Sequence, residues 1–506
     1  MRNFMVQPAT RAPTIQPRGQ YQLPLNFSKT HSKADSDYRV PNFINNAFTS
    51  SAATKWIDVH DPATNFVVSR VPESTDEELK QAVKAAQNAF PSWRATGVLH
   101  RQQIMFKFVA LIRQHWDRLA ASITLEQGKT FADARGDVLH GLQVAETACG
   151  ITTQLTGEVL EVSKDMERRS YREPLGVVAS ICPFSAALIL AELAKEASFP
   201  EGVINIIHGT HNAVNFILDE PSIKAISFVG GNAAGEYIYS RGSANGKRVQ
   251  ANLGARNDAI VLADCHKQQT ITSINGAAFG AAGQRCMVLS ILVLTGKETH
   301  AWIDDIATAA RELKVHRGFE EGADLGPVIS PQSLQRIESL IASAEEEGAE
   351  VVLDGRGYRP DGYDRGNFLG PTIIKGVKPH MKCYQEEIFS PVLVCLEVDT
   401  LAEATNLVND NIYGNGVAIF TKSGSSASWF QRNIEAGQVG INVPIPVPLP
   451  MFSFTGNKKS IAGRGVNTFY GKPGLNFYTQ TKTVTSLWKA SDDMAAKAAV
   501  VMPSQN

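Results

Sequence analysis

Short apolar runs rich in β-branched residues alternate with amphipathic helical patterns through most of this chain. A first series comprises GVVASI, GVINIIHG, KAISFVGG and DAIVLAD, and a second comprises SILVLTG, AEVVLDG, SPVLVCLEV and GVAIFTK. Strands connected by helices pair in parallel, because the crossover returns the chain in the same direction. At 506 residues the chain is long enough for two or three packed units. The pattern therefore predicts an α/β fold with two doubly wound units.

One uncharged stretch, from Pro174 to Ala191, reaches the length of a membrane-spanning helix. Its sequence, PLGVVASICPFSAALILA, is interrupted by Gly176 and Pro183. Its first half is rich in β-branched residues and its second half continues as an amphipathic helix. We therefore expect a strand that runs directly into a helix, and no membrane span.

The charge balance points to small-molecule chemistry. Lysine and arginine total 49 against 50 acidic residues, which favours neither a nucleic-acid partner nor a membrane-surface partner. The six cysteines are widely spread and form neither a CxxC pair nor a His-rich cluster. We expect no disulfide framework and no metal site.

The first 34 residues contain five basic residues and no acidic one. That composition is typical of an organellar presequence, and it predicts a mitochondrial protein. Four prolines would interrupt the amphipathic helix that such presequences form. A disordered tail on a cytoplasmic protein is the alternative.

The segment GAAFGAAGQRCMVLS, residues 276–290, leads through small residues to Cys286. Small residues let other groups approach closely, and a thiol must be accessible and partly ionised to attack a carbonyl. The adjacent Arg285 is expected to favour the thiolate. Taken alone, a single cysteine is more often a buried small hydrophobe.

A second segment, KAISFVGGNAAGEYI, combines a strand, a glycine turn at Gly230 and Gly231, and the start of a helix. A helix N-terminus after such a turn suits the pyrophosphate of a dinucleotide. The glycine spacing alone is weak evidence, because many helices begin after glycines.

These segments, followed by QEEIFSPVL and YGNGVAIFT, resemble the aldehyde dehydrogenase family almost from end to end. The resemblance implies a Rossmann-type cofactor domain that binds NAD, an α/β catalytic domain and a small oligomerisation sheet. It makes Cys286 the nucleophile and places Glu387 on the nicotinamide ribose, with Phe389 beside the ring. The other implied cofactor contacts are Cys182, Phe184, Gly230, Gly231 and Leu253.

Residues 437–460 and 476–489 are similar to the CoA-acylating methylmalonate-semialdehyde branch of that family. Hydrolytic members carry a glutamate where Asn252 stands, which serves as general base for deacylation. Without that carboxylate, coenzyme A is expected to take the acyl group in place of water. The implied reaction converts methylmalonate or malonate semialdehyde to propionyl-CoA or acetyl-CoA, a step of valine and pyrimidine catabolism.

The resemblance also implies how the substrate carboxylate is held. In the family two arginines bind it, one of which corresponds to Arg285 and the other to His140. A neutral imidazole offers one hydrogen-bond donor, whereas a guanidinium can donate to both carboxylate oxygens. The affinity for the substrate carboxylate is therefore expected to fall. The alternative is that His140 is a partly exposed helix residue without a role in binding.

The family pattern divides the chain as follows: a presequence or tail at 1–34, an NAD-binding domain at 35–155 and 174–254, a catalytic domain at 255–455, and oligomerisation strands at 156–173 and 470–490. The implied assembly is a homotetramer.

The chain departs from the family between Phe184 and Ser185, where about thirty residues are missing from the cofactor domain. The absent segment carries a helix, a strand, the asparagine of the oxyanion hole, and the lysine and glutamate that bind the adenosine ribose. We therefore keep two alternatives to the acylating enzyme: a catalytically impaired isoform or silent oligomer subunit, and a hydrolytic aldehyde dehydrogenase, which Asn252 disfavours.

Overall fold

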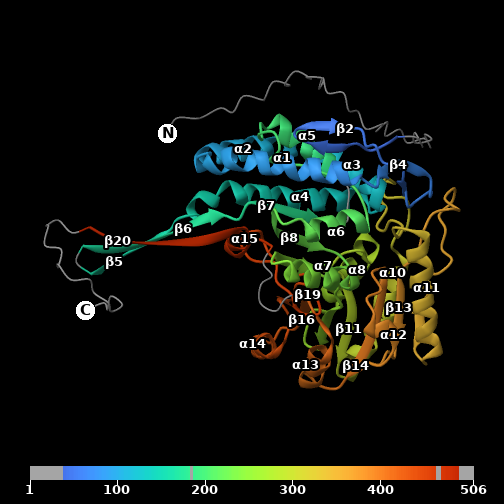
Figure 1. The fold of residues 1–506 in the computed structure, drawn as a ribbon. Helices are drawn as coiled ribbons and strands as arrows, with labels where there is room; N and C mark the ends of the chain where they lie inside the picture. The colour runs from blue at the N-terminus through green and yellow to red at the C-terminus, as the bar shows by residue number, and fades with distance from the viewer. Residues whose placement is uncertain (1–37, 164, 183–185, 463–468, 489–506) are drawn as a thin grey trace, which may run out of the picture.

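The computed structural model describes residues 38–163, 165–182, 186–462 and 469–488. An α-helical layer, two main sheets and a projecting three-stranded arm make up the fold (Figure 1). The predicted presequence and Phe184 lie outside the described residues.

The helical layer follows two hairpins near the start of the described chain. The hairpins are β1 (Asn42–Ile44) with β2 (Ala47–Thr49) and β3 (Trp56–His60) with β4 (Val67–Pro72). The helices are α1 (Asp76–Ala95), α2 (Val98–Gln114), α3 (Trp116–Gln127) and α4 (Phe131–Cys149), and a 3-10 turn (Ile151–Thr153) follows them. A capping box between Thr75 and Glu78 begins α1, because each side chain satisfies a backbone amide of the other. The core of this layer includes Leu119, Leu142 and Ile189.

The first main sheet has four strands in the order β19-β9-β8-β7. The strands are β7 (Val177–Ile181), β8 (Ile223–Val229), β9 (Arg248–Asn252) and β19 (Ile461–Ala462). The first three pair in parallel, and β19 pairs with β9 antiparallel. The helices are α5 (Ala187–Glu196), α6 (His211–Asp219) and α7 (Asn232–Ala244). The strand-to-helix prediction for residues 174–191 is confirmed by β7 and α5, and no described helix is long and apolar enough to cross a membrane.

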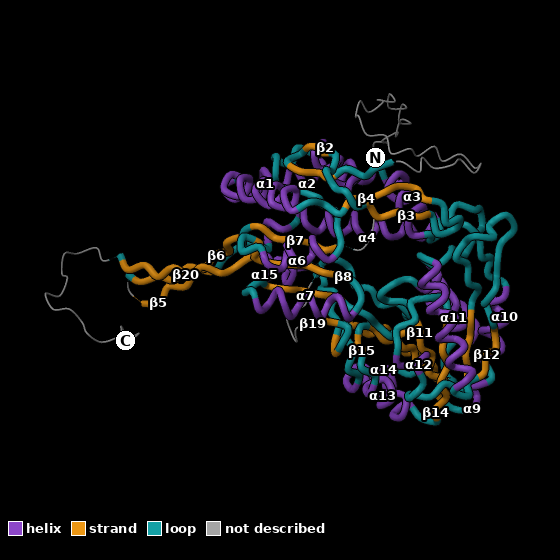
Figure 2. Tube along the Cα trace, turned by 45° about the vertical axis from the view of Figure 1, so that its right-hand side comes forward, coloured by secondary structure: helices purple, strands orange, loops and turns teal. Residues whose placement is uncertain are grey.

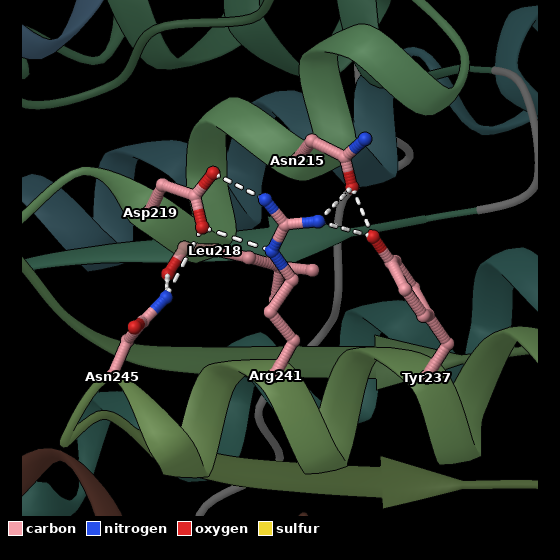
Figure 3. A network of polar contacts seen from close by, with 6 residues as sticks. All are labelled: Asn215, Leu218, Asp219, Tyr237, Arg241 and Asn245. Atoms are coloured by element: carbon pink, nitrogen blue, oxygen red, sulfur yellow. Dashed lines mark hydrogen bonds and ion pairs between the residues drawn. The ribbon is translucent and has the colours of Figure 1, made fainter.

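A network of polar side chains joins α6 to α7 (Figure 3). Arg241 donates through Nε and Nη2 to the two carboxylate oxygens of Asp219, at 2.9 and 2.6 Å. Tyr237 donates to Asn215 at 2.6 Å, and Asn245 donates to the carbonyl of Leu218 at 2.9 Å. The hydrogen bonds from Arg241 hold the pKa of Asp219 below its usual value. The network fixes the two helices beside the sheet.

The prediction of a strand in GVINIIHG is wrong. In the structure this segment has only an isolated antiparallel bridge between Ile206 and Phe43. Among the described residues, β7 pairs only with β8, so its other edge has no strand partner. With no strand partner on that edge of β7 among the described residues, the segment stays outside the sheet. The helix α5 begins after Ala186, a non-glycine residue in a left-handed conformation (φ 70°), without a side-chain cap.

The second main sheet has seven strands in the order β12-β13-β14-β11-β10-β16-β17. The strands are β10 (Asn257–Leu262), β11 (Leu289–Thr295), β12 (Glu350–Leu353), β13 (Thr372–Lys375), β14 (Val392–Val398), β16 (Gly416–Phe420) and β17 (Gln438–Ile441). All adjacent pairs are parallel except β12 with β13. A short pair, β15 (Tyr413–Gly414) with β18 (Asn457–Lys458), lies outside this sheet.

Helices cover the second sheet and bury two large apolar clusters. They are α8 (Lys267–Phe279), α9 (Lys297–His300), α10 (Trp302–Arg311), α11 (Pro331–Glu346), α12 (Lys382–Gln385), α13 (Leu401–Asp410) and α14 (Gly424–Asn433). One cluster includes Ile337, Val394 and Phe430, and the other includes Phe279, Leu292 and Ile306. The prediction of two α/β units is confirmed.

The arm extends away from both sheets (Figures 1 and 2). It consists of β5 (Glu158–Ser163), β6 (Met166–Pro174) and β20 (Thr479–Leu487), and α15 (Gly471–Tyr478) leads into β20. Both strand pairs are antiparallel. The pairing of β6 with β20 brings together two segments about three hundred residues apart in sequence. At its end Val159, Leu160 and Trp488 are 70%, 65% and 74% exposed.

Candidate active site

Cys286 lies between a tight turn, Gly280–Gly283, and strand β11. Ala281, Ala282 and Gly283 are all left-handed, with φ of 54°, 51° and 67°. A Cβ at Gly283 would stand 1.9 Å from the carbonyl oxygen of Ser390, so only glycine fits there. The small residues before Cys286 thus allow the segment after Glu387 to approach the nucleophile turn closely.

Two asparagine side chains hold the backbone of Cys286. Asn257 and Asn415 donate to its carbonyl oxygen at 3.0 and 3.1 Å. Asn257 also donates to the carbonyl of Val288 at 2.8 Å and accepts from the amide of Gly416 at 3.0 Å. Sequence reasoning missed both asparagines, because their partners are backbone groups far away in sequence.

Cys286 is a residue of intermediate exposure. Burial by the surrounding atoms, together with the negative charge of Glu387, raises its pKa to about 11. Arg285 does not act as predicted here, because its guanidinium forms an ion pair with Asp133 of α4. The expectation that Arg285 favours the thiolate is therefore wrong.

The raised pKa makes alkylation of Cys286 strongly pH-dependent. The thiolate is the reacting form, so its labelling rate by iodoacetamide should rise about tenfold per pH unit from 7 to 10. Glutathione, with a thiol pKa near the usual value of about 8.5, should level off within this range. Mass spectrometry of the labelled Cys286 peptide measures the rate. A plateau of Cys286 labelling below pH 9 would contradict the raised pKa.

Glu387 lies close enough to Cys286 to influence its titration. Its carboxylate accepts from the amide of Ala255 at 2.9 Å, and a Cβ at Gly254 would stand 2.7 Å from its other oxygen. Burial raises the pKa of Glu387, while the Ala255 amide and Arg256 oppose that rise. The structure thus brings the predicted ribose ligand and the predicted nucleophile together.

Phe389 follows in a left-handed conformation, with φ 58°, and is half-buried. The next residue, Ser390, is buried, and its hydroxyl has no hydrogen-bond partner among the described residues. Burying such a hydroxyl costs about 1–3 kcal/mol.

The glycine turn lies where the sequence predicts it. A Cβ at Gly230 would stand 2.5 Å from the ring of Phe228, which explains the glycine. Gly231 is the N-cap of α7 and makes no side-chain cap bond, while no atom lies within 4 Å of the place where its Cβ would stand. The space at this position would accommodate a serine or threonine side chain.

The segment after β9 faces this turn. Leu253 is buried, and its side chain covers Gly235, where a Cβ would stand 1.9 Å away. Asn252, at the end of β9, is 4% exposed. Asn232, which sequence reasoning missed, accepts from the amide of Gly254 at 2.9 Å and donates to the carbonyl of Lys459 at 2.8 Å.

Two further predicted site residues, Cys182 and His140, are exposed. Cys182 follows β7, is exposed, and its sulfur lies 3.4 Å from the hydroxyl of Ser180. His140 is exposed on α4. It follows Asp133 and Asp137 at helical spacings of seven and three, so the three residues share one face of that helix. Asp137 accepts from the buried Lys129 at 2.5 Å.

The sequence matches the model of the aldehyde dehydrogenase family over residues 48–189 and 184–484. The chain belongs to the aldehyde dehydrogenase family. The two matched stretches meet at 184–189, which is where the sequence predicts the missing segment. The resemblance stated from motifs and the α/β fold class are thereby confirmed.

Relatives in this family match the chain over nearly their whole length. The chain is 49% identical to the methylmalonate-semialdehyde/malonate-semialdehyde dehydrogenase [acylating], mitochondrial, of Bos taurus, and the alignment covers 96% of each chain. It is 48% identical to the Homo sapiens protein of the same name over 535 aligned positions, covering 100% of this chain and 99% of that one. That alignment is longer than the 506 residues of this chain, so it contains gaps in this chain.

Solved structures share the fold. A putative methylmalonate-semialdehyde dehydrogenase from Sinorhizobium meliloti, complexed with NAD, is 36% identical with a TM-score of 0.88, covering 90% of this chain and 99% of that one. The methylmalonate-semialdehyde dehydrogenase of Oceanimonas doudoroffii is 38% identical, with the same TM-score and coverage.

Proposed function

We propose that this chain catalyses the NAD-dependent, CoA-acylating oxidation of methylmalonate or malonate semialdehyde in the mitochondrion. The observation that carries the proposal is the similarity, over nearly the whole length of both chains, to enzymes named for this reaction and named as mitochondrial. The position of Cys286 beside Glu387 supports it. The products are propionyl-CoA and acetyl-CoA respectively.

The residues present fit the nicotinamide side of NAD. Gly231 leaves the N-terminus of α7 without a side-chain cap, and the space beside it is open, which suits a pyrophosphate. Glu387 is held by the Ala255 amide at the distance of an ordinary hydrogen bond, 2.9 Å. When bound, NAD supplies the hydride acceptor.

The cysteine performs the covalent chemistry. The sulfur of Cys286 adds to the aldehyde carbon and the thiol proton passes to the aldehyde oxygen, which gives a thiohemiacetal. Loss of a hydride from its carbon and of a proton from its hydroxyl then leaves a thioester. The thiolate of coenzyme A then attacks the thioester carbonyl, and Cys286 leaves as a thiolate. The bond between the α-carbon and the carboxylate breaks to release carbon dioxide, and the electron pair left on the α-carbon takes a proton from water.

Asn252 favours coenzyme A over water as the acyl acceptor. Its amide cannot take a proton from water, whereas the glutamate of hydrolytic members can. Asn252 is buried at the end of β9, beside the Leu253 and Gly254 segment that faces Glu387. A thiolate needs no general base to attack a thioester.

We also propose a homo-oligomer, a tetramer, built through the arm. Val159, Leu160 and Trp488 are exposed apolar side chains on a narrow antiparallel sheet, and such surfaces are stabilised by contact with another chain. Within one chain, we assign 35–155 and 174–254 to NAD binding, 255–455 to catalysis, and 156–173 with 470–490 to assembly.

The proposal is tested with purified protein, malonate semialdehyde, NAD and coenzyme A. We expect NADH and acetyl-CoA in equal amounts, and little NADH when coenzyme A is left out. NADH formation at the same rate without coenzyme A would indicate a hydrolytic enzyme instead.

The shortened first sheet favours a second candidate, an impaired isoform or silent oligomer subunit. β7 has no second strand partner among the described residues, and Ala186 enters α5 in a left-handed conformation. This candidate predicts assembly with an intact relative and no NADH under any condition.

Restoring an arginine on α4, His140→Arg, should improve use of malonate semialdehyde over propanal. A bidentate guanidinium contact to a carboxylate contributes roughly 1.5–3 kcal/mol, about a tenfold gain in kcat/KM or more. His100→Arg, at an exposed position on α2, is the matched control. The comparison is made in a background that carries the missing segment, and equal gains for both aldehydes would show that position 140 does not face the substrate.

A further inference from the structure

We propose that Asp133 is a positioning residue that holds the nucleophile turn, so that the thiol of Cys286 meets the incoming carbonyl. The inference rests on the proposed role of Cys286 as the nucleophile. It adds a residue on α4, in a different part of the chain, to the machinery that presents this cysteine.

One carboxylate holds the turn on both sides. Its Oδ2 accepts from the amide of Ala281 at 2.9 Å, and its Oδ1 accepts from the guanidinium of Arg285. Ala281 is the first residue of the left-handed run of Ala281, Ala282 and Gly283, and Arg285 lies two residues after its end. Alanine in this conformation persists only where surrounding contacts impose it. Asp133 thus contacts the first residue of the run and the residue that immediately precedes Cys286.

Asp133 is itself fixed in place. It lies in the first turn of α4, where a carboxylate is favoured by the helix dipole. The hydroxyl of Thr130, the N-cap, accepts from the amide of Asp133 at 3.2 Å. Thr130 is buried, so the start of α4 is packed against its surroundings. A movement of this helix end would be transmitted directly to the nucleophile turn.

The other contacts of the turn do not replace Asp133. Gln284 donates to the carbonyl of Pro327 at 3.2 Å and accepts from the amide of Ile329 at 2.9 Å. These bonds hold the turn from the side of the loop before α11, and Asn257 with Asn415 hold the carbonyl of Cys286. The Asp133 contacts connect the turn to α4, the helix that also carries His140.

The test uses the full chain and the acylation of Cys286 by p-nitrophenyl acetate, which needs no NAD, coenzyme A or semialdehyde. We expect Asp133→Ala to lower the limiting acylation rate at least about tenfold, with little change in the half-saturating ester concentration. Asp133→Asn should lie between Asp133→Ala and the unmodified protein, because its amide oxygen can still accept from Ala281 but cannot form the ion pair. The control is Asp117→Asn, which breaks an exposed ion pair with Arg135, and it should acylate at the unmodified rate.

A purely structural role predicts a different result. If Asp133 only stabilises the start of α4, the melting temperature falls while the limiting rate of folded protein stays unchanged, and the proposal is overturned. Asparagine is nearly equal in size to aspartate, so Asp133→Asn takes the place of Asp133→Ala in the test if the alanine variant does not fold. A limiting acylation rate equal to that of the unmodified protein would then overturn the proposal as well. The ester readout stays informative even where no NADH forms from a semialdehyde, so failure here is distinguishable from failure of the proposed function.

Discussion

Cys286→Ala should abolish acyl-enzyme formation and lower turnover at least about a thousandfold, because removal of a covalent nucleophile leaves only binding and electrostatic effects. The position of Cys286 after a strained turn of small residues, with its carbonyl held by two asparagines, supports this role. Intact-mass spectrometry after reaction with an activated ester measures the acyl-enzyme directly.

Cys265→Ala is the matched control for that experiment. Cys265 is buried and accepts from the hydroxyl of Thr270 at 3.3 Å, and its thiol pKa is raised by burial. This variant should form the acyl-enzyme as the unmodified protein does. Acyl label on another cysteine, with Cys286 untouched, would overturn the assignment of the nucleophile.

Binding of NAD should be at least about a hundredfold weaker than in a relative with the complete cofactor domain. Two charged hydrogen-bonding groups for the adenosine ribose are absent, and each such bond contributes roughly 1.5–3 kcal/mol. Glu387 and the turn at Gly230 and Gly231 remain, so some affinity for the nicotinamide side should persist. Isothermal calorimetry on the purified chain gives the dissociation constant.

Inserting the missing segment after Phe184 provides the comparison. The insert should restore the affinity for NAD and give β7 a second strand partner, which would draw the segment around Ile206 into the sheet. A dissociation constant in the low micromolar range for the unmodified chain would show that other residues replace the absent ribose ligands.

Local pattern predicted most of the fold, because β-branched runs and helical periodicity mark strands and helices wherever the sheet is complete. GVINIIHG was the exception. Its composition suits a buried strand, but a strand also needs a neighbour, and the residues that would supply one are absent between β7 and α5. Strand pairing is a long-range property that a local run does not contain.

The site was predictable where a residue type carries the chemistry, as with Cys286 and Glu387. It was not predictable where hydrogen-bond or ion-pair partners that are distant in sequence determine the role of a residue. Arg285 stands next to Cys286 in sequence, yet its guanidinium pairs with Asp133, 152 residues away, and burial sets the thiol pKa. Asn257 gave no signal, because its side-chain hydrogen bonds reach backbone groups in two segments that are distant in sequence.

The most direct test of the central claim follows the thioester on Cys286. Protein, NAD and isotopically labelled malonate semialdehyde are mixed for a single turnover, and the labelled Cys286 peptide is then followed by mass spectrometry with and without coenzyme A. We predict that the label persists in water and is lost rapidly to labelled acetyl-CoA when coenzyme A is added. Loss of the label at the same rate without coenzyme A would contradict the assignment of an acylating enzyme.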